Sequence, residues 1–123
     1  MSKNADTVAA YFRSVDSEDL VALASLFADG AVVMTAGAGE RHGERILNFY
    51  RSVFKKFPQH QDAPTRILEI GETIVAEIEF TGRSSSGVEV AFPAVDIFDL
   101  QDGKIVRLTQ WVDTYALERK LAT

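Results

Sequence analysis

The feature that most constrains this fold is a predicted β-hairpin over residues 88–113. The segment reads VEVAFPAVDIFDLQDGKIVRLTQWVD. The pair Asp102-Gly103 is typical of a two-residue hairpin turn, and a long run rich in β-branched and aromatic residues lies on each side of it. In the first run both sets of alternate residues are mainly apolar. This pattern predicts an interior strand that is covered on both faces.

One residue of that strand, Asp96, does not suit an apolar environment. On its own face it alternates with Phe92, Ala94 and Phe98. Burial disfavours a charged carboxylate, so we expect a raised pKa for Asp96 unless hydrogen-bond donors compensate. Perturbed acids in clefts are often functional, and Asp96 is therefore a candidate site residue. The alternative is a buried acid that is satisfied by backbone or hydroxyl groups and serves only the fold.

The hydrophobic period divides the rest of the chain into a helical half and a β-rich half. Apolar residues at helical spacing predict three helices, over 8–15, 20–27 and 44–57. Between the second and the third helix we expect a short strand over 31–35 and a loop over 36–43. After Pro58 the pattern predicts a polar connection over 59–64 and two strands over 65–70 and 73–81. Beyond the hairpin it predicts a final helical turn over 115–121.

This order indicates an α+β fold, with three N-terminal helices packed on a curved, mainly antiparallel sheet. Pro93 inside an interior strand suggests a β-bulge, which would help the sheet to curve. A curved sheet closed on one side by helices leaves a conical cavity, a natural site for a small molecule. With 123 residues, the chain fits a single domain, residues 1–123.

Composition excludes several classes of function. The chain has no cysteine, and its net charge is −5 without a pronounced basic cluster, so we expect neither nucleic acid nor an anionic membrane as a partner. No apolar run reaches the roughly 18 residues of a membrane span, and the first residues lack a signal-peptide core, so we expect a cytoplasmic protein. The two histidines form no metal-binding motif, and His60 is expected to be solvated. We expect no metal and no cofactor.

Three motifs resemble the NTF2-like cone-fold superfamily, which includes ketosteroid isomerases, SnoaL-like polyketide cyclases and limonene epoxide hydrolases. They are D-x-x-x-L-x-x-L-F-A-D-x-A-x-V at 19–33, H-G-E-R-I-L-x-F-Y at 42–50 and V-D-x-F-x-L-x-D-G-K-I at 95–105. The resemblance covers essentially the whole chain. It implies the cone fold and a homodimer that forms through the sheet face turned away from the helices. The superfamily hosts many chemistries, and some of its members catalyse nothing.

The resemblance to the ketosteroid isomerases implies roles for three residues. Tyr11 falls on the tyrosine of that family's oxyanion hole, and Asp96 falls on its protonated aspartic acid. Thr35 falls on the general base. Because a threonine hydroxyl is too weak to move a carbon-bound proton near neutral pH, strict ketosteroid isomerase activity is not expected.

The other families add Asp113, which matches the acid–base aspartate that polyketide cyclases place near the end of the last strand. The Asp-Arg-Asp arrangement of the epoxide hydrolases is broken here, since Glu77 and Glu79 have no arginine between them. The face of the last strand that points inward is left open by the sequence. Five further residues are candidates to line the ligand cavity: Thr35, Phe54, Phe92, Phe98 and Trp111.

Three functions follow from these residues. The first is an enzyme that isomerises or cyclises an apolar carbonyl compound through an enolate, with Tyr11 and a neutral Asp96 as oxyanion donors. In this enzyme, Asp113 or a group that the sequence does not reveal would move the proton. The second is a binding protein for a small apolar ligand without catalysis, which Thr35 favours. The third is a homodimeric interaction module whose cavity is vestigial.

Overall fold

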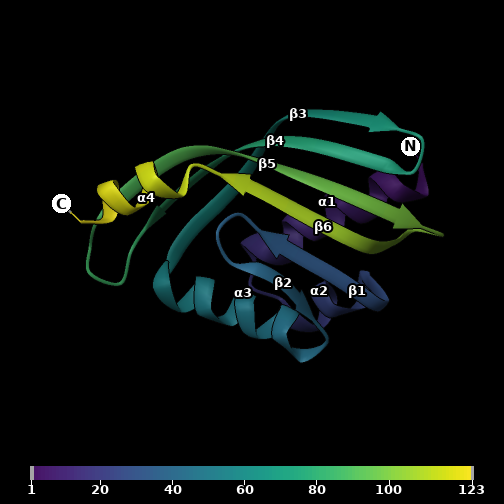
Figure 1. Ribbon diagram of the computed structural model, residues 1–123, viewed down its shortest axis with the longest axis horizontal. Coiled ribbons are helices and arrows are strands. Elements are labelled where there is room, and N and C mark those ends of the chain that lie inside the picture. The colour runs from purple at the N-terminus through teal and green to yellow at the C-terminus, as the bar shows by residue number, and fades with distance from the viewer. Residues whose placement is uncertain (1, 123) are drawn as a thin grey trace.

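A curved six-stranded sheet with helices on one face forms the body of the molecule (Figure 1). The computed structural model describes residues 2–122. The helices are α1 (Lys3–Asp16), α2 (Leu20–Ser25), α3 (Glu44–Lys56) and α4 (Thr114–Leu121). The strands are β1 (Phe27–Thr35), β2 (Gly39–His42), β3 (Gln59–Ile70), β4 (Thr73–Arg83), β5 (Glu89–Gln101) and β6 (Lys104–Val112). The predicted α+β class is confirmed. No helix within residues 2–122 is long and apolar enough to cross a membrane.

The predicted hairpin is present as β5 and β6, and it lies in the interior of the sheet. Strand order is β2-β1-β6-β5-β4-β3, with every neighbouring pair antiparallel except β1 and β6. Asp102 and Gly103 both have positive φ values, 52° and 74°, as a two-residue turn of this twist requires. The helices cover only one face of β5. Val95 and Ile97 on the other face are half-buried, so the prediction of coverage on both faces is wrong for the single chain.

Several element boundaries differ from the sequence predictions. β1 begins at Phe27, within the predicted second helix, because α2 ends at Ser25 and Phe27 already pairs with Ile105 on β6. The predicted loop 36–43 contains β2, which pairs back on β1. The predicted polar connection 59–64 is the first half of β3. Pro93 forms no bulge: its register with β4 is continuous, and it lies one residue beyond the last pairing of β5 with β6.

The register brings polar and apolar side chains of four strands into rows on the concave face. One row runs from Ala76 on β4 through Asp96 on β5 and Gln110 on β6 to Thr35 on β1. Residues directly opposite each other in neighbouring strands share a face of the sheet. The concave face packs on α1 around a core of buried apolar side chains, which include Val8, Tyr11, Phe12, Val33, Ile74, Phe98, Ile105 and Leu108.

The other face of the sheet carries no helix. Leu68 and Trp111 on this face are 41% and 49% exposed, and an open hollow of about 500 Å³ lies over the middle of β4 and β5 and the end of β6. The hollow is lined on this face by Thr65, Glu77, Glu79, Pro93, Val95, Trp111 and Asp113.

Candidate functional site

A cavity of about 230 Å³ lies between the concave face of the sheet and helices α1, α3 and α4. Its wall is mostly apolar and aromatic, with a small number of polar groups, as is typical of small-molecule sites. The apolar lining includes Val15, Phe49, Val53, Phe57, Ile78, Phe80, Phe92, Ala94, Trp111, Val112 and Leu117. The polar lining consists of Tyr11, Thr35, Tyr50, Lys56, His60, Asp62, Asp96 and Gln110. A cavity between the sheet and the helices, as the sequence predicts, is therefore present.

Asp96 lies in the middle of β5 and points its carboxyl group into this cavity. The residue is only 1% exposed, and its Oδ2 atom has no hydrogen-bond partner within residues 2–122. Burial, and to a smaller extent the negative charge of Asp62, raises the pKa of Asp96 well above its usual range. Burial therefore favours the neutral form of this carboxyl group. In that form its O–H group is a hydrogen-bond donor, and no atom of residues 2–122 pairs with Oδ2.

Two tyrosine hydroxyls lie on the helical side of the cavity. Tyr11 on α1 and Tyr50 on α3 are 1% and 3% exposed, and their hydroxyl oxygens are 2.7 Å apart. Burial is the main cause that raises the pKa of both phenols, so both stay protonated near neutral pH. Tyr11 also packs edge-on against Phe98, with ring centroids 5.0 Å apart. These contacts fix the Tyr11 ring while its hydroxyl faces the cavity.

A directional chain of hydrogen bonds reaches Tyr11, whose hydroxyl also shares a hydrogen bond with the Tyr50 hydroxyl. Arg41 Nη1 donates to Thr35 Oγ1 at 3.1 Å, and Thr35 Oγ1 donates to Gln110 Oε1 at 2.8 Å. Gln110 Nε2 then donates to the Tyr11 hydroxyl at 3.3 Å. Because hydrogen bonds in such a chain polarise one another, the donation that Tyr11 receives makes its own O–H group a stronger donor. Thr35 is thus occupied on both sides by Arg41 and Gln110.

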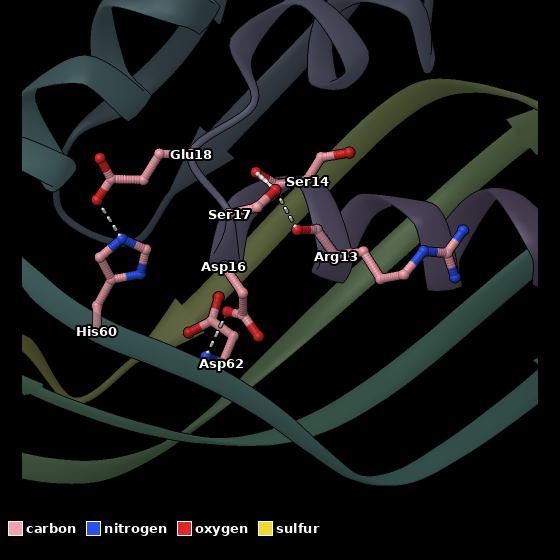
Figure 2. Close-up of polar contacts among 7 residues, drawn as sticks. All are labelled: Arg13, Ser14, Asp16, Ser17, Glu18, His60 and Asp62. Atoms are coloured by element: carbon pink, nitrogen blue, oxygen red, sulfur yellow. Dashed lines mark hydrogen bonds and ion pairs between the residues drawn. The ribbon is translucent and has the colours of Figure 1, made fainter.

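A second polar cluster lies where β3 passes the end of α1 (Figure 2). Asp62 lines the cavity, and its backbone N–H donates to Asp16 Oδ1 at 2.9 Å. Burial and the neighbouring negative charge of Asp16 raise the pKa of Asp62 to about 6. His60 lies 2.8 Å from Glu18 Oε2 and stacks on Phe54, with 5.1 Å between ring centroids. Its side chain is 3% exposed, so the prediction that His60 is solvated is wrong.

The structure brings some of the sequence-predicted site residues together and separates others. Tyr11, Thr35, Asp96, Phe92 and Trp111 all line the cavity. Phe54 lies behind the wall, in contact with Tyr50 and His60, and Phe98 is fully buried beneath Tyr11.

Asp113 lies outside the cavity. Its Oδ1 accepts from the backbone N–H of Ala116 and caps α4, and the residue is exposed beside the hollow on the opposite sheet face. On β6, Gln110 points toward Tyr11, while Trp111 borders both the cavity and the hollow.

Five polar cavity residues were not identified from the sequence as site residues: Tyr50, Lys56, His60, Asp62 and Gln110. Gln110 carries a usable signal, since it is a polar residue between Leu108 and Val112 in an apolar alternation, as Asp96 is in its own strand. Tyr50 is one aromatic among many in the apolar stripe of α3 and has no such signal. Within residues 2–122, no three His, Asp or Glu side chains are placed to hold a metal ion.

Comparison with solved structures gives the same fold at low sequence identity. An NTF2-like protein of unknown function from Burkholderia pseudomallei is 21% identical over 100% of both chains, with a TM-score of 0.93. A protein from Jannaschia assigned as a SnoaL-like polyketide cyclase is 20% identical, with 98% of this chain and 92% of that chain covered and a TM-score of 0.91. TerC, crystallised with polyporic acid, is 19% identical over 99% and 100% of the two chains, with a TM-score of 0.89.

These similarities confirm the NTF2-like fold that the sequence motifs imply. No curated protein sequence matches the chain. The family of SnoaL-like domains matches residues 8–108, a span that begins in α1, ends in β6 and includes Tyr11, Thr35, Asp62 and Asp96. This chain belongs to the SnoaL-like domain family.

Proposed function

We propose that the protein is an enzyme that isomerises or cyclises a small apolar carbonyl compound through an enolate. The carbonyl oxygen accepts hydrogen bonds from the Tyr11 hydroxyl and from the neutral carboxyl group of Asp96. When a C–H bond next to the carbonyl group breaks, negative charge develops on that oxygen. Donors that are already oriented in a site of low polarity stabilise such charge strongly.

The observation that carries this proposal is the unpartnered Oδ2 atom of Asp96. Leaving a buried polar group without a partner costs about 1–3 kcal/mol, so a fold keeps one where another molecule satisfies it or where function requires it. Here the atom belongs to a cavity that also holds the Tyr11 hydroxyl. The volume of about 230 Å³ suits a molecule of two or three fused rings.

Binding of 2-naphthol, a planar phenol that resembles an enol, tests the proposed oxyanion site. We expect Tyr11→Phe and Asp96→Leu each to weaken binding by about 10- to 100-fold, the range that corresponds to loss of one strong buried hydrogen bond. Asp99→Leu is the matched control, because it makes the same change on the outer face of the same strand, and it should leave affinity unchanged. Isothermal titration calorimetry gives the dissociation constants. Equal affinity in all four proteins would contradict the proposal.

A second candidate is a binding protein without catalysis, and the state of Thr35 favours it. The Thr35 hydroxyl is engaged by Arg41 and Gln110, and it stands where the ketosteroid isomerases carry their general base. A binding protein would take up the naphthol through the same donors but would not exchange protons with a bound ketone. Turnover therefore separates the two candidates.

We also propose that two copies associate through the sheet face that carries no helix. Half-buried Val95 and Ile97 and exposed Leu68 and Trp111 form an apolar strip on this face. Apolar residues on both faces of an interior strand are typical of a strand whose outer face meets another layer. A second copy would supply that layer.

A further inference from the structure

The proposed oxyanion site lacks a group that moves the proton, since Thr35 is unsuitable and Asp113 lies outside the cavity. We propose that Asp62 is the general base, and that it removes a proton from a carbon conjugated to the carbonyl group of an apolar cyclic ketone. This inference rests on the proposed function, because it places the carbonyl oxygen at Tyr11 and Asp96.

The register of the sheet places Asp62 and Asp96 on the same concave face, both line the cavity, and the negative charge of Asp62 raises the pKa of Asp96. Asp62 on β3 shares a cross-strand row with Phe80 and Phe92. Asp96 lies two rows further along the same concave face. The row between them consists of Ile78, Ala94 and Val112, which all line the cavity. An apolar ring that binds against this row lies between the two carboxyl groups.

The two acids differ in their surroundings in the way that acid–base chemistry requires. Asp96 is fully buried and stays neutral, so it donates a hydrogen bond. Asp62 is only half-buried, and its pKa of about 6 makes it largely ionised at neutral pH, yet basic enough to accept a proton. Pairs of acids whose environments separate their pKa values commonly mark the acid and base roles of a site.

The charges around Asp62 come from each element packed against it. The titratable or charged side chains that face it are Asp16 and Tyr11 on α1, Tyr50 and Lys56 on α3, His60 on β3 and Asp96 on β5. Asp16 raises the pKa of Asp62 and His60 lowers it, so these two are positioning residues with opposite effects. Glu18 holds His60, and the contact of Asp16 Oδ1 with the Asp62 backbone N–H fixes the distance between the two acids (Figure 2).

In the proposed step, the carboxylate of Asp62 forms an O–H bond with the proton while the C–H bond of the substrate breaks. The electron pair of that bond moves into a new C=C bond, and the carbonyl π electrons move to the oxygen held by Tyr11 and Asp96. Return of the same proton to a different carbon of the conjugated system gives an isomer. The step needs no redox partner, and its atoms and charge balance.

Deuterium exchange into 2-tetralone, a bicyclic ketone with acidic C–H groups, tests this proposal by ¹H NMR in D₂O. We expect the exchange rate of the wild-type protein to rise with pH around a midpoint near 6. Asp62→Asn should lower the rate at least 100-fold, within the range typical of a general base, while 2-naphthol affinity changes less than threefold. Circular dichroism checks that the variant is folded.

Two variants of the positioning residues should shift the pH midpoint of the exchange rate. A merely structural role of Asp62 would not produce such a shift. Asp16→Asn removes a negative charge and should shift the midpoint to lower pH, whereas His60→Gln should shift it to higher pH. The inference is overturned if Asp62→Asn keeps the exchange rate, if neither variant moves the midpoint, or if wild-type protein binds the ketone without exchange. In the first two cases, naphthol binding that depends on Tyr11 and Asp96 would leave the proposed function intact. Ketone binding without exchange would instead favour the binding protein over the enzyme. Loss of that dependence would overturn the proposed function itself.

Discussion

At the scale of single residues, the molecule holds a carboxyl group where burial disfavours the charged form. An unfolded aspartic acid has a pKa of about 3.9, and burial raises the pKa of Asp96 in the folded state. Below about pH 4 both states carry the proton, so the ionisation of Asp96 costs no stability there. As the pH rises, the unfolded state releases its proton and the folded state does not, and stability falls by about 1.4 kcal/mol per pH unit until the folded pKa is reached.

Asp96→Asn should remove this dependence, because an amide does not titrate. The difference in unfolding free energy between the variant and the wild type should then grow in favour of the variant by about 1.4 kcal/mol per unit as the pH rises above about 4 toward the raised folded pKa of Asp96. Urea unfolding at three pH values measures it. The neighbouring change Phe98→Leu should shift stability by the same amount at every pH. A constant difference for Asp96→Asn would mean that Asp96 is ionised in the folded protein.

The same scale shows which site residues a sequence can reveal. Asp96 was predicted because one carboxyl group interrupts an otherwise apolar alternation. Tyr11 was predicted from family resemblance, and it does line the cavity. Asp62 could not be predicted, since it lies in a stretch with several polar residues and a proline that reads as a loop. Tyr50 could not be separated from the aromatic residues around it on α3, because phenol and phenyl rings fit the same stripe.

At the scale of elements, β3 shows why the local alternation of residues did not predict this strand, whereas it did predict the hairpin of β5 and β6. The strand carries one extra residue between Pro64 and Arg66, where its register with β4 shifts. Such a bulge reverses the alternation along the strand. Asp62 and Ile67, five residues apart, therefore occupy positions on the same face, which a strict period of two would assign to opposite faces. The hairpin of β5 and β6 has a standard turn, and its extent was predicted closely.

The placement of α1 depends on a buried contact with the turn of that hairpin. Thr7 Oγ1 donates to the carbonyl oxygen of Gly103 at 2.6 Å, and Thr7 is 8% exposed. Thr7→Val keeps the shape but leaves this carbonyl group without its donor, so it should lower the unfolding free energy by about 1–3 kcal/mol in urea. Ser25→Ala removes an exposed hydrogen bond to Ala22 and should cost less than about 0.5 kcal/mol. Equal effects would mean that the Thr7 contact does not hold α1.

At the scale of the whole molecule, the sheet face without a helix bears on assembly. Val95 lies near the middle of that face, between Glu77 on β4 and Trp111 on β6. Val95→Lys places a charge where the proposed dimer would bury it, while Glu77 offers the lysine a partner in the monomer. We expect the wild type to sediment as a dimer and this variant as a monomer.

Val21→Lys is the control for that experiment, because Val21 is 85% exposed on α2, away from the sheet face. It should leave the sedimentation coefficient of the dimer unchanged. A monomeric wild type, or a dimeric Val95→Lys variant, would show that this face does not join two copies.

Helix α4 lies at one end of the molecule, far from the N-terminus (Figure 1). It has no buried residue, yet Leu117 reaches the cavity wall. An eight-residue helix without a buried residue is stable only through its packing contacts. A ligand that contacts Leu117 therefore acts on this helix directly. Since the sequence contains no cysteine, a thiol introduced at exposed position 118 would accept a single fluorescent dye. A change in the fluorescence emission of that dye would report that the cavity is occupied, without a turnover assay.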